Sequence, residues 1–85
     1  MMDACLITFR SVTPAQRGEG ALRREGIQCA LQRTPKQLAD QGCGYSLRIW
    51  TNDISGSVAI LRRENVQMQR VYMQIPDGTL EEMEL

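Results

Sequence analysis

One cysteine of this 85-residue chain lies in a setting that favours reactive sulfur chemistry. Cys43 stands between Gly42 and Gly44 at the start of an alternating apolar stretch, so no neighbouring side chain shields the sulfur. Glycine amides can turn toward one point and stabilise an anion such as a thiolate or a persulfide. Arg33, Lys36 and Arg48 are near enough in sequence to favour the thiolate form further. Cys43 is therefore either a reactive thiol or a structural residue of a glycine-flanked turn.

The other two cysteines indicate a structural role. Cys5 and Cys29 fall on the apolar face of alternating stretches, where cysteine behaves as a small hydrophobic residue. Three widely spaced cysteines do not form a disulfide framework. The chain has no histidine and no pair of cysteines at CxxC spacing, so the sequence predicts neither a zinc site nor a cysteine–histidine nucleophile.

The charges are distributed unevenly, although the net charge is zero. Four of the ten acids follow Pro76 and all ten bases precede it, so the body of the chain carries +4. Nine of the bases are arginine, whose planar fork suits anionic groups. Trp50 alone is not an aromatic platform for stacked bases, and we do not expect a nucleic-acid interface.

The sequence also predicts where the protein is located. No apolar run approaches the roughly 20 residues that a membrane span needs. The start MMDACLITFR lacks a basic segment followed by a long apolar one, so it does not have the pattern of a signal peptide. We therefore expect a cytoplasmic protein with no membrane partner and with reduced thiols.

Hydrophobic periodicity predicts four strands and two main helices. Alternation with a period of two indicates strands over residues 5–10, 27–32, 45–50 and 70–75. Thr13 is the expected N-cap of the first helix, with Pro14 in its first turn and Gly26 as its left-handed stop. Asn52 or Asp53 should cap the second helix, which ends at Asn65. One or two helical turns are expected over residues 36–41.

This order, β-α-β-β-α-β, predicts an α+β fold of the ferredoxin-like plait type. In that plait a four-stranded antiparallel sheet carries two helices on one face. We expect one domain over residues 1–76, a turn at 76–78 and a loose acidic tail over residues 77–85. The loop over residues 34–44 is longer than a hairpin needs, and extra length in a connection often carries function.

Two segments resemble a family of small bacterial proteins described as selenium or sulfur carriers. They are FRSVTPAQRGEGALRREGI and TPKQLADQGCGYSLRI, and the resemblance covers roughly the first fifty residues. Lys36 replaces the arginine that is usual at its position, which keeps the charge and loses the bidentate geometry. The positions that match the family pattern are Phe9, Ser11, Thr13, Ala15, Glu19, Gly26 and Ile27, followed by Thr34, Pro35, Leu38, Gly42, Cys43 and Gly44.

The resemblance implies that Cys43 accepts sulfur or selenium as a persulfide or selenopersulfide. The donor would be a protein such as a cysteine desulfurase, and an acceptor protein would take the cargo, so the chain would be a relay and not a stand-alone enzyme. No cofactor is implied other than this transient covalent sulfur or selenium. In this scheme the amides of Gly42 and Gly44 steady the cargo, Lys36 and Arg48 tune it, and Thr34 and Pro35 hold the loop away from the sheet.

Another interpretation of the sequence stays open beside the carrier. The chain could be a non-catalytic regulatory module that binds a small ligand or a protein, with Cys43 as a mere turn residue. Two further questions stay open: whether the cargo is sulfur or selenium, and whether two chains pair through a strand edge as a homodimer.

Overall fold

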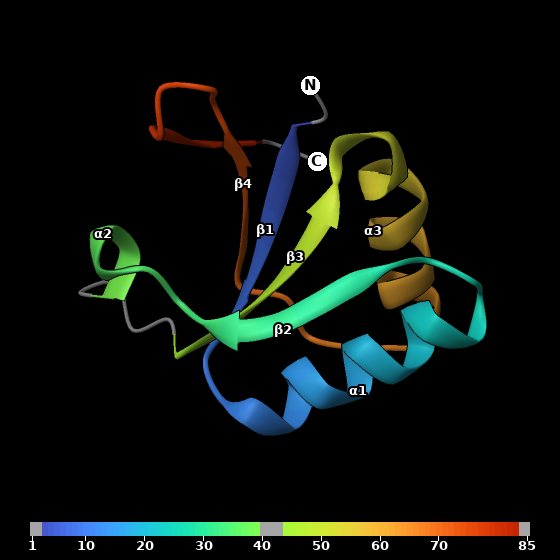
Figure 1. The fold of residues 1–85 in the computed structure, drawn as a ribbon. Coiled ribbons are helices and arrows are strands. Elements are labelled where there is room, and N and C mark those ends of the chain that lie inside the picture. Colours follow the sequence, from blue (N-terminus) through green and yellow to red (C-terminus); the bar gives the residue numbers. More distant parts are fainter. Residues whose placement is uncertain (1–2, 40–43, 84–85) are drawn as a thin grey trace.

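The protein is described by a computed structural model that covers residues 3–39 and 44–83. These residues form an α+β fold with an antiparallel sheet and two main helices (Figure 1). The strands are β1 (Ala4–Phe9), β2 (Cys29–Arg33), β3 (Tyr45–Trp50), β4 (Arg70–Gln74) and β5 (Leu80–Glu82). The helices are α1 (Val12–Arg24), the short α2 (Lys36–Ala39) and α3 (Ile54–Arg63), and a 3₁₀ turn, η1 (Thr51–Asp53), precedes α3.

The sheet has five strands in the order β2-β3-β1-β4-β5, and every neighbouring pair is antiparallel. Helices α1 and α3 cover one face and bury the main core, in which Phe9, Leu22 and Leu61 are fully buried. The short helix α2 lies on the opposite side of the strands (Figure 1). We call this second side the open face, because α2 is the only helix among the described residues that packs onto it.

The helix ends are partly as predicted. Gly26 has a φ of 80° and Asn65 a φ of 57°, so both predicted left-handed stops are confirmed. The N-cap of α1 is Ser11, with extended backbone, and the prediction of Thr13 is wrong by two residues. Proline is tolerated throughout the first helical turn, so Pro14 does not fix the start. No helix in the described part of the chain is long and apolar enough to cross a membrane.

The prediction of a loose acidic tail after four strands is wrong. The tail contributes a fifth strand, β5, whose Leu80 pairs with Gln74 of β4. The connecting turn is stabilised by Gly78, which has a φ of 93°, and by the Asp77 carboxylate, which accepts a hydrogen bond from the Thr79 amide at 2.8 Å. Hydrogen bonding with the side chain of Thr79, and then with its backbone amide, lowers the pKa of Asp77. The sequence did not indicate β5, because a strand of three residues, two of them acidic, is too short to show alternation.

Strand β1 is buried on both faces, whereas its alternation with a period of two is typical of a strand with one better-buried face. Leu6 and Thr8 point to the open face, yet they are 3% and 0% exposed. Leu6 belongs to a second apolar cluster with Leu38 of α2 and Tyr72 of β4. The helix α2 therefore covers part of the face that the sequence pattern left to solvent.

Gly18 and Gly20 of α1 are predicted to respond oppositely to substitution. A Cβ at Gly18 would lie 3.2 Å from Leu47 and 3.3 Å from Leu61, so this glycine permits close packing of α1 on the sheet. We expect Gly18→Val to lower the free energy of unfolding by about 1–3 kcal/mol through overpacking. Gly20→Ala, whose Cβ meets only Arg24 at 3.6 Å, should raise it by up to about 1 kcal/mol. Urea unfolding measures the free energy of unfolding of both variants. Equal changes in the two variants would contradict the close packing of α1 on the sheet at Gly18.

Candidate functional site

The loop between β2 and β3 is held at both of its described ends. The amide of Thr34 donates to the carbonyl of Gly44 at 3.3 Å, and the amide of Gly44 donates to the carbonyl of Phe9 at 3.0 Å. The loop therefore leaves the sheet where β2 ends, β3 begins and β1 ends. Two predicted site residues, Gly42 and Cys43, lie outside the described residues, and Cys43 is the residue bonded to Gly44.

Gly44 has a structural reason for being glycine. A Cβ at this position would lie 3.1 Å from the carbonyl oxygen of Arg10, which is closer than most real Cβ contacts. Its amide is already paired with Phe9, so it is not free to stabilise an anion as predicted. Any other contribution of Gly44 to binding stays a prediction.

A pair of hydroxyl groups joins the start of the loop to the sheet. The Thr34 and Ser46 hydroxyl oxygens lie 2.9 Å apart, and Ser46 is fully buried. Ser46 lies opposite Thr8 of β1, whose hydroxyl donates to the Arg70 carbonyl and accepts from the Arg70 amide. Sequence reasoning missed this polar row, although Ser46 and Thr8 occupy the outward positions of their alternating stretches.

We expect the Thr34–Ser46 pair to show an asymmetric mutational effect. Thr34→Val leaves the Ser46 hydroxyl buried without this partner, and it should lower the free energy of unfolding by about 1–3 kcal/mol. Ser46→Ala should cost less, because Thr34 is only half-buried and its hydroxyl can turn to water. Urea unfolding of the two single variants checks this order, and a larger loss for Ser46→Ala would contradict it.

The loop packs against the sheet through α2. Leu38 is 5% exposed and contacts the cluster of Leu6 and Tyr72, with Leu80 of β5 packed beside it. Its amide donates to the carbonyl of Pro35 at 2.9 Å. The prediction that Thr34 and Pro35 hold the loop away from the sheet is therefore wrong.

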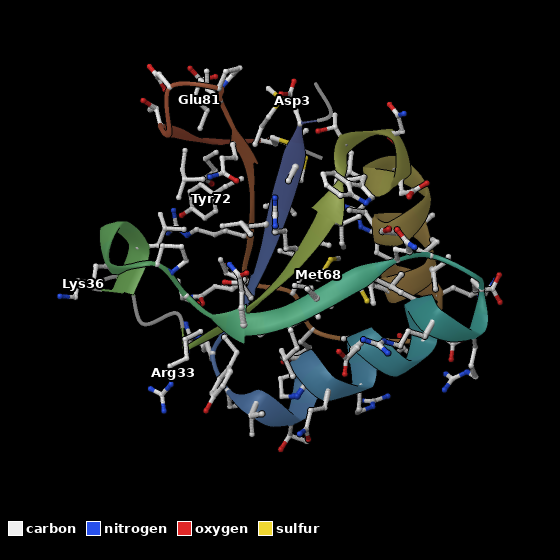
Figure 2. The ribbon with its side chains drawn as sticks, viewed as in Figure 1. Asp3, Arg33, Lys36, Met68, Tyr72 and Glu81 are labelled. Carbon is white, nitrogen blue, oxygen red and sulfur yellow. The ribbon has the colours of Figure 1, made fainter. Side chains whose placement is uncertain are left out.

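The two predicted cationic residues are not brought together. Lys36 is exposed and points away from the strands (Figure 2). Arg48 lies on the open face of β3, with its guanidinium 5.4 Å from the centre of the Trp50 ring. Four residues of strand place the Arg48 backbone about 13 Å from Gly44. Arg48 and Pro35 nevertheless line the same hollow of the open face. That Lys36 and Arg48 tune the cargo stays a prediction.

The two described cysteines lie on the core side of the sheet, as expected. Cys5 is 0% exposed, and its sulfur lies 3.7 Å from the Thr51 hydroxyl and 3.9 Å from the Met83 sulfur. Cys29 is half-buried and lies 4.0 Å from the carbonyl oxygen of Glu19. Burial raises the pKa of both thiols above its ordinary value. Both are free thiols that hold their protons at neutral pH.

Alkylation should reflect these raised pKa values. Only the thiolate attacks iodoacetamide, so the reaction of Cys5 and Cys29 should be slow at neutral pH and accelerate as the pH rises toward their raised pKa values. Short iodoacetamide pulses across a pH series, followed by peptide mass mapping, give the rate for each cysteine. Cys5 should be the slowest because its sulfur is also buried. Fast labelling of Cys5 at neutral pH in the folded protein would contradict this prediction.

The described residues contain no group of cysteine and acidic side chains that could hold a metal ion.

Comparison with known proteins identifies the family. No curated protein and no solved structure gives a significant match. The family model described as "Putative Se/S carrier protein-like" matches residues 4–73, which run from the first residue of β1 to the penultimate residue of β4. The chain therefore belongs to the Se/S carrier protein-like family.

Proposed function

We propose that this protein carries sulfur or selenium as a persulfide or selenopersulfide on Cys43. The observation that carries the proposal is the family match over residues 4–73, within which Cys43 lies. The two described cysteines support it by elimination, because Cys5 and Cys29 face the core and burial raises their pKa. Cys43, the third cysteine of the chain, lies outside the described residues.

The transfer needs no external oxidant or reductant. The Cys43 thiolate attacks the outer sulfur of a donor persulfide, a new sulfur–sulfur bond forms at Cys43, and the donor leaves as a thiolate. In the second step an acceptor thiolate attacks the outer sulfur, and Cys43 leaves as a thiolate. Outer selenium follows the same two steps. The protein is thus a relay that is restored after each cycle.

The anchoring of the loop supports this role. Gly44 is tied to Phe9, Thr34 to Ser46, and Leu38 to the open face, so the described residues on either side of residues 40–43 are anchored to the sheet. A partner that docks at the loop therefore meets a preorganised surface, which favours group transfer.

The proposal includes the partners and the cellular location. We propose a donor such as a cysteine desulfurase, a protein acceptor and a cytoplasmic location.

The strand order supports a fold type for the carrier. Within the sheet, β3 lies between β1 and β2, and β1 lies between β3 and β4. We propose that this order is the split β-α-β arrangement of a ferredoxin-like plait, to which β5 adds an edge strand.

A two-stage loading experiment tests the proposal. The reduced protein is incubated with a cysteine desulfurase and either cysteine or selenocysteine, then desalted and weighed intact. We expect a gain of one sulfur or selenium atom, which an added small thiol then removes. A protein that gains no mass from a donor shown to be active would overturn the carrier function.

A further inference from the structure

A hollow on the open face has the composition of a small-molecule site. Its walls come from β1, β2, β3, the start of the loop and the β4–β5 hairpin. The apolar lining consists of Leu6, Pro35 and Leu80, and the polar lining includes Gln32, Arg48 and Gln74. We call it the Arg48 hollow. Binding sites for small molecules combine apolar walls with a few convergent polar groups in this way.

The polar groups of the Arg48 hollow have unused hydrogen-bonding capacity. Arg48 forms no ion pair with any described residue, and its guanidinium lies 5.4 Å from the centre of the Trp50 ring. The side chains of Gln32 and Gln74 are half-buried, and neither makes a hydrogen bond to the described part of the chain. The Trp50 ring limits the freedom of the guanidinium, so less entropy is lost when a ligand pairs with it.

The charge of the lining selects the kind of ligand. Arg48 is the only charged residue among those described that line the Arg48 hollow. One guanidinium pairs with a carboxylate through two parallel hydrogen bonds, whereas phosphate sites usually gather several cations and backbone amides. Leu6 and Leu80 then provide an apolar surface for the remainder of the ligand.

From this geometry we propose that the Arg48 hollow binds a small organic monocarboxylate with an apolar body. Arg48 holds the carboxylate, Gln32 and Gln74 donate from the flanks, and the apolar body lies against Leu6 and Leu80. The site uses none of residues 40–43, although Arg48 and Pro35 are also among the residues predicted to assist the carrier function of Cys43.

The chain's one tryptophan makes the test direct, since Trp50 contacts Arg48. N-acetyl-leucine is titrated into the full-length protein while Trp50 fluorescence is recorded, with N-acetyl-leucinamide and inorganic phosphate as comparison probes. We expect N-acetyl-leucine to cause a saturable change in fluorescence with a dissociation constant in the millimolar range, which is typical of a ligand of this size. The uncharged amide and phosphate should cause no saturable change. Arg48→Gln should raise the dissociation constant by roughly 10- to 150-fold, the effect of losing a charge-assisted pair.

Arg33→Gln is the matched control. Arg33 is also an exposed strand arginine that stacks on an aromatic ring, 5.8 Å from the centre of Tyr45, but it lies outside the hollow. Its substitution should leave binding unchanged. Amide shifts of β3 and β4 in the NMR spectrum of the wild-type protein give a second readout that needs no variant. No saturable response, equal binding of the uncharged amide, preference for phosphate, or unchanged binding by a folded Arg48→Gln variant would each overturn the proposal.

Discussion

The Cys43→Ser variant is expected to gain no sulfur or selenium from an active desulfurase, whereas the wild-type protein gains one atom. The hydroxyl of serine stays protonated at neutral pH and does not attack a persulfide, so loading should fall to background. Intact mass after incubation and desalting measures the loss. No other single substitution should affect the carrier function as much.

Cys29→Ser is the matched control for this prediction. Cys29 is a half-buried thiol that faces the core, and its raised pKa keeps it protonated. Its replacement should leave the loading of Cys43 unchanged at neutral pH. Equal loss of loading in both variants would show that Cys43 is not a specific acceptor.

Replacement of Leu38 by aspartate should have the largest effect on stability that is tied to the loop. Leu38 is 5% exposed and attaches α2 to Leu6 and Tyr72, and the side chain of Tyr72 extends from β4 toward α2 (Figure 2). The substitution removes a buried leucine and introduces a carboxylate that must stay hydrated. We expect a loss of about 2–5 kcal/mol in the free energy of unfolding, as for other buried leucines. Because α2 has only four residues, part of the response should be local detachment of this helix.

Hydrogen exchange and urea unfolding together check the Leu38 prediction. The Leu38 amide, which donates to the Pro35 carbonyl, should lose its protection in Leu38→Asp even where the core amides of β1 keep theirs. Lys36→Ala is the control on the same helix, since the exposed Lys36 should contribute no more than about 0.5 kcal/mol. Full protection of the Leu38 amide in the aspartate variant would contradict the packing of α2 on the sheet.

The sequence predicted the elements that follow a clear period. Four strands and both main helices were found from alternation and from spacings such as Ile54, Val58 and Leu61, because one face of each element must be buried. Strand β5 was missed because three residues with two acidic side chains show no such period. The burial of Leu6 was missed because it depends on Leu38 of α2 and Tyr72 of β4, which are far from Leu6 in the sequence.

The candidate site could be predicted only in part for a similar reason. The sequence pattern of glycine beside cysteine is the same whether the glycine forms an anion site or prevents a clash with a neighbouring backbone. At Gly44 the structure shows such a clash, because a Cβ would lie 3.1 Å from the carbonyl oxygen of Arg10. No local sequence pattern indicates this contact. The pairing of Thr34 with Ser46 likewise depends on the register of β2 against β3.

The most direct measurement locates the cargo on the chain. The loaded wild-type protein is alkylated to protect the terminal sulfur or selenium, digested and sequenced by tandem mass spectrometry. Our account predicts the added atom on the peptide that contains Cys43 and on no other cysteine. The added atom on Cys5 or Cys29, with Cys43 unmodified, would contradict it.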